Sequence, residues 1–425
     1  VADWNIYLAE DDLYTLTTLS LVQEVGETRY KQHALLADFA AEKLGDNDEA
    51  NGRMARYFLQ FAQENQEIFE ALDPEWENLL AAVQVAHQER AWQLVLDLTA
   101  ALGRSWFRYG RYHDANTAYA LAETAAQQLD SDEDLAHILL NWAEVGIEQS
   151  NYDDAWGWLE TALDLFYKLE NGFGIAKSKY FQGFILYDQG QYQEAEKALL
   201  ESKKLYETVK AATDQALTIE NLARLYFAID TTPDRAQSLA DQALYLQENE
   251  KNDLGRVSVL RFLSNIRIRQ GELDEAERFA LMSASVSASL NNPAERCATN
   301  YLLLTIYRLQ KNHLLAEELA IKTIELCRVL GNRKLEAMIL HELSVNNLAT
   351  GKIEQAKTII EQSLTIYREI EDRLGYGYAL RQLGDIYATM NKPELGLQAW
   401  REARQIAEYL AHQHLISQLQ ERISG

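Results

Sequence analysis

Four arginines are the side chains best suited to binding chemistry in this sequence. They are Arg224, Arg261, Arg308 and Arg381. A guanidinium group forms forked hydrogen bonds with a carboxylate or a phosphate, and nearby aromatic rings would add rigid contact area. The chain carries 40 basic against 65 acidic residues, which gives a net charge of −25. Arginines gathered on one strip of such an acidic chain would favour a site for an anionic ligand.

Catalytic chemistry has no comparable signal. The sequence contains no HExxH, CxxC or GxSxG pattern, and its eight histidines are scattered. Its Asp and Glu residues follow helical surface patterns, which are normally solvated charge. The segment Asn171–Ser178 loosely resembles a phosphate-binding loop, but Asn171 and Ala176 occupy the required glycine positions and no strand precedes it. We therefore expect no catalytic site, no metal site and no cofactor in this chain.

A short sequence motif, here called the repeated phrase, recurs along the chain, and the helices on either side of it must position the arginines. One copy reads Gly190-Gln-Tyr-Gln-Glu-Ala195, and the copies follow one another at a spacing of 40 residues with one step of 41. The small residue that closes each copy stands at Ala115, Ala155, Ala195, Ala236, Ala276, Ala316, Ala356 and Gly396. A fixed period of this size is typical of a stacked repeat protein. We interpret each phrase as the turn between two antiparallel helices, with a left-handed residue such as Gly at the first helix end.

The first helix of each pair is expected to line a concave groove, with positions ten, six and three residues before the turn residue facing inward. With the extra residue of the fourth copy placed after its first helix, this register selects Glu220 there and Ile268 in the fifth copy. It predicts a binding groove lined by Tyr180, Phe184, Tyr187, Arg224, Arg261, Asn265, Arg308, His341 and Arg381. The groove would bind a protein, an acidic peptide or a small phosphorylated or carboxylated molecule. Alternatively, the arginines form ion pairs with Asp and Glu residues of neighbouring repeats.

The repeated phrase resembles the tetratricopeptide repeat, and Leu383-Gly384-x-x-Tyr387 is a close match to it. The resemblance covers residues 91–407. It implies an all-α fold, a right-handed superhelical solenoid of eight helix-turn-helix repeats of about 40 residues, against the usual period of about 34. The longer repeat is similar to the sensor solenoids of bacterial signalling ATPases and of maltose-regulator-type transcription activators. Residues 46–90 are expected to be a helical bridge, and residues 408–425 a C-terminal capping helix.

Residues 1–45 do not follow the repeat. Leucines at helical spacing, a hairpin over 21–32 and a helix over 34–44 give the outline of a small winged-helix domain. This segment resembles the winged helix that follows the nucleotide-binding core in STAND signalling ATPases of the NB-ARC type. The resemblance implies that His33 would reach the phosphates of ADP in a full-length parent protein. The alternative role for His33 is to cap the helix that follows it.

The resemblance implies that the repeats sense a ligand or protein and regulate an upstream STAND NTPase, with ATP or ADP bound in the parent rather than in this fragment. The alternatives are a constitutive protein–protein interaction scaffold or a self-association module that forms a homo-oligomer.

The acidic surface disfavours binding to nucleic acid and to anionic membranes. No apolar run is long enough to span a bilayer. Two cysteines, Cys297 and Cys327, are expected to be reduced packing residues of a cytoplasmic protein. Because the chain begins at Val1 within an apparent domain, we expect it to be a fragment.

Overall fold

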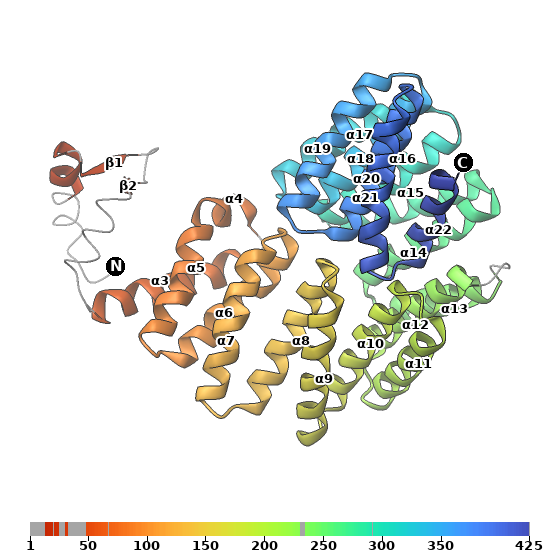
Figure 1. Ribbon diagram of the computed structural model, residues 1–425. Coiled ribbons are helices and arrows are strands. Elements are labelled where there is room, and N and C mark those ends of the chain that lie inside the picture. Colours follow the sequence, from red (N-terminus) through yellow and green to blue (C-terminus); the bar gives the residue numbers. More distant parts are fainter. Residues whose placement is uncertain are drawn as a thin grey trace. The chain divides into compact units, whose positions relative to one another are not determined.

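The computed structural model describes residues 13–19, 21–24, 30–32, 48–66, 68–229, 234–290 and 292–424. The chain divides into two compact units, Val1–Leu102 and Gly103–Gly425 (Figure 1). Within the described residues, no helix is both long enough and apolar enough to cross a membrane.

The first unit begins with a helix over 13–18 and a hairpin. Strand β1 (Val22–Glu24) pairs antiparallel with β2 (Tyr30–Gln32), and Val22 lies opposite Gln32. Three helices follow, α3 (Asp48–Asn65), α4 (Phe69–Leu72) and α5 (Trp76–Gln88), with a 3-10 turn over Asp73–Glu75 before α5. The hairpin agrees with the sequence, but the expected helix over 34–44 and His33 lie outside the described residues. The winged helix therefore stays a prediction.

Antiparallel helices build the rest of the chain, and from α7 onward each helix packs on the next in sequence. The first helices of the pairs are α6 (Trp92–Arg108), α8 (Asp132–Glu148), α10 (Gly172–Asp188), α12 (Ala212–Ile229), α14 (Asp253–Gln270), α16 (Pro293–Leu309), α18 (Arg333–Ala349) and α20 (Arg373–Thr389). The second helices are α7 (Tyr112–Gln128), α9 (Tyr152–Lys168), α11 (Tyr192–Thr208), α13 (Asp234–Asn249), α15 (Leu273–Ser289), α17 (His313–Val329), α19 (Ile353–Glu369) and α21 (Pro393–Tyr409). A last helix, α22 (Gln413–Ser424), lies where the capping helix was expected.

Left-handed residues end the helices, as the repeated phrase predicts. Within the pairs, the backbone angle φ lies between 57° and 78° at Gly110, Ser150, Gly190, Gly271, Lys311, Gly351 and Asn391. The corresponding residue of the fourth copy, Thr231, is outside the described residues. Between pairs, φ lies between 49° and 63° at Arg90, Asp130, Glu170, Lys210, Lys251, Gly331, Glu371 and Ala411. Each connection can therefore be short, because a single left-handed residue reverses the chain.

Small residues let the two helices of a pair approach closely. The seven closing alanines of the repeated phrase are fully buried. Where serine stands on the first helix, its hydroxyl reaches the partner helix: Ser264 Oγ donates to the carbonyl of Ala276 at 2.7 Å, and Ser344 Oγ to that of Ala356 at 2.8 Å. The buried hydroxyl groups thus gain a partner without disturbing the helical hydrogen bonds.

Size complementarity also holds successive pairs together. Phe166 near the end of α9 packs against Gly174 in the first turn of α10, where an added Cβ would overlap the aromatic ring. The same eight-residue relation joins Tyr367 to Gly375 and Gln247 to Gly255. At the equivalent positions of α17 and α18 the sizes are exchanged: the smaller residue is Cys327, and the larger Leu335 follows eight residues later; both are buried. Both Cys297 and Cys327 are buried and free.

The segment that resembles a phosphate-binding loop is the beginning of a helix. Asn171 caps α10, because its Oδ1 accepts a hydrogen bond from the amide of Gly174 at 2.9 Å. Asn252 and Asp372 cap α14 and α20 in the same way. The segment is therefore a repeated capping motif whose amide groups already have partners.

Candidate binding groove

The first helices of three successive pairs enclose a cavity of about 610 Å³, here called the groove cavity. Its lining residues are Phe184 and Tyr187 of α10, Asn221, Arg224 and Phe227 of α12, and Phe262, Asn265, Ile268 and Arg269 of α14. Four of the residues predicted from the repeat register, Phe184, Tyr187, Arg224 and Asn265, are brought together here. A volume of this size suits a small ligand or a few residues of a peptide.

Aromatic rings and guanidinium groups alternate along the wall of the groove cavity. The guanidinium carbon of Arg224 lies 4.7 Å from the ring centre of Phe262. Phe262 meets Phe227 edge to face, with ring centres 5.6 Å apart and ring planes at 83°. The guanidinium carbon of Arg269 covers the other ring, 3.9 Å from the centre of Phe227. Each guanidinium cation therefore lies against one aromatic ring, and the negative face of the ring attracts and stabilises the cation.

The two arginines of the wall differ in how their charge is balanced. Arg224 is paired with Glu220 at 2.5 Å, and the Glu220 side chain is only 2% exposed. The hydroxyl of Ser258 also donates to Glu220, at 2.9 Å. Arg269 donates to the backbone carbonyl of Phe227, and no ion pair with Asp or Glu is found for it in the described part of the chain. Arg269 is exposed, so its charge is available to a ligand.

Tyr180 lies behind this wall rather than on it. Its hydroxyl accepts a hydrogen bond of 2.6 Å from Asn221 Nδ2. Burial, and next the charge of Glu220, raise the pKa of Tyr180, so the phenol stays neutral. Tyr180 thus orients Asn221, whose side chain contributes to the cavity wall.

The remaining predicted residues lie further along the first helices and do not line the groove cavity. Arg261 is paired with Glu295 of the next repeat, and Arg308 Nε lies 3.1 Å from the carboxylate of Glu342. Arg381 donates to Gln418 at 3.1 Å. These contacts agree with the alternative interpretation for Arg261 and Arg308, in which arginines pair with acids of neighbouring repeats.

His341 is influenced by two of these arginines. Burial, and next the charges of Arg381 and Arg308, lower the pKa of His341 to about 4. Its Nε2 is buried and has no hydrogen-bond partner among the described residues. At neutral pH the imidazole is therefore uncharged, and it adds no charge to the arginine strip.

Sequence reasoning missed Asn221, Phe262 and Arg269. Each stands one helical position beside a residue that the register selects, namely Glu220, Arg261 and Ile268. The register selects one row of side chains along each helix. The groove cavity is wider than one row and includes side chains of the neighbouring row. An arginine at the end of α14, where the first helix of the preceding pair, α12, offers the ring of Phe227, was the signal that could have identified Arg269.

Comparison with known proteins clarifies the fold. The family model named tetratricopeptide repeat matches residues 295–369, which correspond to α16–α19. The helix pairs before and after this segment repeat its geometry. The second unit is a tetratricopeptide-like solenoid. No curated protein matches the chain.

Two solved structures with TM-scores above 0.5 share the fold of this chain, and a third is similar with a lower score. The Rap conjugation gene regulator of the plasmid pLS20, in complex with the Phr* peptide, has 13% identity and a TM-score of 0.56, covering 79% of this chain and 97% of that one. Yeast Tom70 has 15% identity and a TM-score of 0.53, covering 94% and 81%. A STAND protein with a tetratricopeptide repeat sensor from Pyrococcus horikoshii has 15% identity and a TM-score of 0.47, covering 96% and 60%. Identities this low indicate the fold alone.

Proposed function

We propose that the solenoid binds a peptide with acidic side chains in the groove cavity. The observation that carries this proposal is Arg269, an exposed cation held against Phe227 without an acidic partner in the described residues. A peptide carboxylate can bind its guanidinium group while apolar peptide side chains contact Phe184 and Phe262. Asn265 can both donate to and accept from the peptide backbone, and the Oδ1 of Asn221 can accept from it, because Asn221 Nδ2 already donates to Tyr180.

Two further observations support a peptide rather than a compact molecule. The groove cavity is formed by three successive first helices, so it extends along the direction in which the repeats stack. The plasmid pLS20 regulator, which has the same fold, was solved in complex with a peptide. A concave surface built from repeats is well suited to an extended segment.

The finer proposal is that peptide binding regulates an upstream STAND NTPase. The basis is the resemblance of residues 1–45 to the winged helix of such proteins, with His33 placed to contact ADP. A ligand that prefers one of two states shifts the population toward that state. The bound peptide would favour the ATP-bound, self-assembling form. ATPase activity of the full-length parent should then increase with peptide in the wild type but not in Arg269→Glu.

Peptide binding can be tested directly on the 425-residue chain. Fluorescence anisotropy would compare a labelled peptide set in which Glu alternates with Leu and Phe and a matched set with Lys in place of Glu. Binding of the acidic set should weaken by about tenfold or more in Arg269→Glu, equivalent to about 1.4 kcal/mol. Arg278→Glu is the matched control, because Arg278 is exposed and pairs with Glu275 outside the cavity. Acidic peptides that fail to bind, or that bind Arg269→Glu as tightly, would overturn the proposal.

Self-association is the second candidate, and a specific surface favours it. Leu314 of α17 is 80% exposed, and Leu281 and Ile321 on neighbouring second helices are each 49% exposed. Exposed apolar side chains on adjacent helices are typical of interaction surfaces. A dimer seen by light scattering without peptide, and lost in Leu314→Asp, would favour this candidate.

A further inference from the structure

Two sets of repeats that are distant in sequence meet along a line that we call the seam. On one side stand Glu148 and Gln149, at the end of α8. On the other stand Lys334 in α18 and Glu371 and Asp372, before α20. Gln149 is separated from Glu371 by 222 residues, yet its Nε2 donates to the Glu371 carboxylate at 2.8 Å. The seam therefore joins surfaces that no single repeat contains.

Successive hydrogen bonds connect the side chains on the two sides of the seam. Trp142 Nε1 donates to Asn116 Oδ1 at 2.9 Å, and Asn116 Nδ2 donates to Gln149 Oε1 at 2.9 Å. Gln149 is 5% exposed and completes the chain at Glu371. Since each amide both accepts and donates, the orientation of every group follows from its neighbour.

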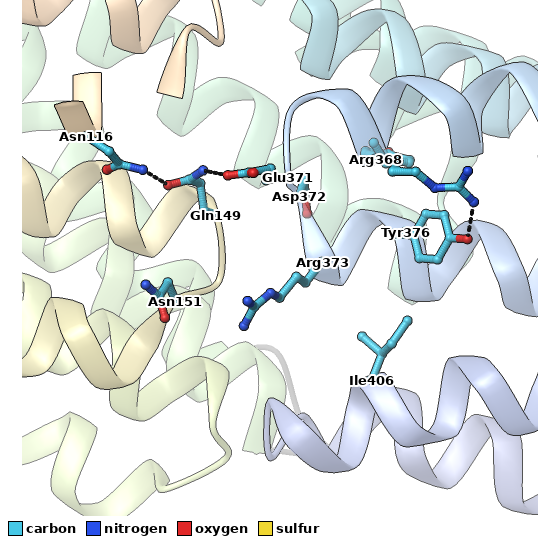
Figure 2. A pocket seen from close by; sticks show the side chains of 10 residues that line it. Asn116, Gln149, Asn151, Arg368, Glu371, Asp372, Arg373, Tyr376 and Ile406 are labelled. Carbon is cyan, nitrogen blue, oxygen red and sulfur yellow. Dashed lines mark hydrogen bonds between the residues drawn. The ribbon is translucent and has the colours of Figure 1, made fainter. Parts of the chain in front are cut away.

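A cavity of about 400 Å³, here called the seam cavity, opens beside this chain. Asn116, Gln149 and Asn151 line one side of it, and residues from Tyr367 to Tyr376 line the other, together with Ile406 of α21. Figure 2 shows Arg373 extending from the start of α20 toward Asn151. The cavity is therefore bounded by repeats from both sides of the seam.

The acidic groups at the seam cavity already have polar partners, whereas the basic ones have no acidic partner among the described residues. Glu371 accepts the hydrogen bond of Gln149. Asp372 caps the amide of Gly375 at 2.7 Å and lies 3.7 Å from Lys334. Arg368 donates to the hydroxyl of Tyr376 at 2.8 Å. Neither Arg368 nor Arg373 forms an ion pair with Asp or Glu within the part of the chain that the structure describes, although the chain has 65 acidic residues.

We propose that the seam cavity is a second binding site, separate from the groove cavity, for a small organic anion that carries one phosphate or carboxylate group. The guanidinium group of Arg373, which extends toward Asn151, binds the anionic group. The ring of Tyr376 and the side chain of Ile406 contact the apolar body of the ligand. The volume is within the range of small-molecule sites.

Such a ligand contacts both sides of the seam at once. Its anionic group binds Arg373 on one side, and its polar substituents reach Asn151 on the other. A ligand that binds only when both sides are in place favours the closed seam, by the reciprocity of linked equilibria. The site would thus couple the concentration of a small anion to the contact between distant repeats.

Isothermal titration calorimetry on the 425-residue chain tests this site. The probes are phenyl phosphate and benzoate, which distinguish a phosphate from a carboxylate ligand, and phenol is the uncharged control. We expect saturable binding of at least one anion with a Kd below about 1 mM, and no binding of phenol. Arg373→Glu should weaken the binding by about tenfold or more. Arg278→Glu, which makes the same change of charge on an exposed helix face, should leave it unchanged.

A second readout separates this site from the groove cavity. Phe262→Ala alters the groove cavity and should not affect binding of phenyl phosphate or benzoate. The proposal is overturned if neither anion binds saturably, if Arg373→Glu binds as well as the wild type, or if Phe262→Ala removes the binding.

Discussion

Lys334 in α18 forms an ion pair with Glu148 at the end of α8, across 186 residues of sequence. The Asp372 carboxylate lies 3.7 Å from the same ammonium group. Burial acts to lower the pKa of Lys334, but Glu148 and Asp372 raise it more, so the net pKa is above its ordinary value. Lys334 therefore stays charged at neutral pH and holds two carboxylates that belong to different repeats.

Removal of this charge should weaken the seam. Lys334→Met leaves Glu148 and Asp372 without their shared cation, and we expect the free energy of unfolding to fall by about 1–3 kcal/mol. Urea unfolding at pH 7, followed by circular dichroism, measures the change. Lys357→Met is the matched control, because Lys357 has a similar exposure but pairs only with Glu361 one turn away on the same helix, and such a pair contributes little. Equal losses in the two variants would contradict a specific role for Lys334.

Asp188 should make stability decrease as the pH rises through a defined window. Burial raises the pKa of Asp188 to about 6 from an ordinary value of 3.8, although the hydroxyl of Tyr152 donates to it at 2.9 Å. Between pH 3.8 and about pH 6 the folded state binds more protons at Asp188 than the unfolded state does. The free energy of unfolding therefore decreases as the pH rises through this range. Asp188→Asn should therefore be more stable than the wild type at pH 7, by about 1–3 kcal/mol. Urea midpoints at pH 4 and pH 7 test this, and exposed Asp164→Asn should show no such difference.

His341 should have the opposite dependence on pH. Its pKa is lowered to about 4 by burial and by two arginines, against an ordinary value of 6.5. Between these values the unfolded state binds more protons, so stability is lost as the pH falls. His341→Gln should flatten the decrease in urea midpoint between pH 6.5 and pH 4. The exposed His113 provides the control, and an unchanged slope in His341→Gln would show that His341 does not cause the decrease.

Complementary residue sizes at the junctions of successive repeats can be tested by a double-mutant cycle. Gly174→Leu should overfill the space beside Phe166, and Phe166→Cys should leave a cavity, each with a loss of about 1–4 kcal/mol. The double variant reproduces the native pair Cys327 and Leu335 of a later junction. We expect it to lose about 1–3 kcal/mol less than the sum of the single variants, from urea unfolding. Simple additivity would show that the two positions do not share one packing space.

The turns and the buried small residues could be predicted from the sequence, because each repeat carries its own copy of the repeated phrase. The spacing of the repeated phrase located the turns, and every described turn residue has the left-handed backbone expected there. The buried alanines after the turns follow from the same phrase. The register also selected Phe184 and Arg224, which line the groove cavity. These features depend on contacts within a repeat or between adjacent repeats.

The seam could not be predicted, because it depends on the accumulated rotation of many repeats. A small change of angle at each junction would place Gln149 opposite a residue other than Glu371. Neither residue belongs to the repeated phrase, and nothing near them in sequence indicates a partner 222 positions away. The pairing of Arg261 with Glu295 and of Arg308 with Glu342 was also open, since the acidic chain offers many possible partners.

The seam has a consequence for the length of the chain. An open solenoid tolerates the gain or loss of a whole repeat, because each repeat contacts only its neighbours. Here the repeats between α8 and α18 act as a spacer of fixed length, since their number determines whether Lys334 meets Glu148. A duplication or deletion of one repeat in that interval would preserve every neighbouring contact and still separate the two residues. The number of repeats between α8 and α18 is thus fixed by a contact that no single repeat forms.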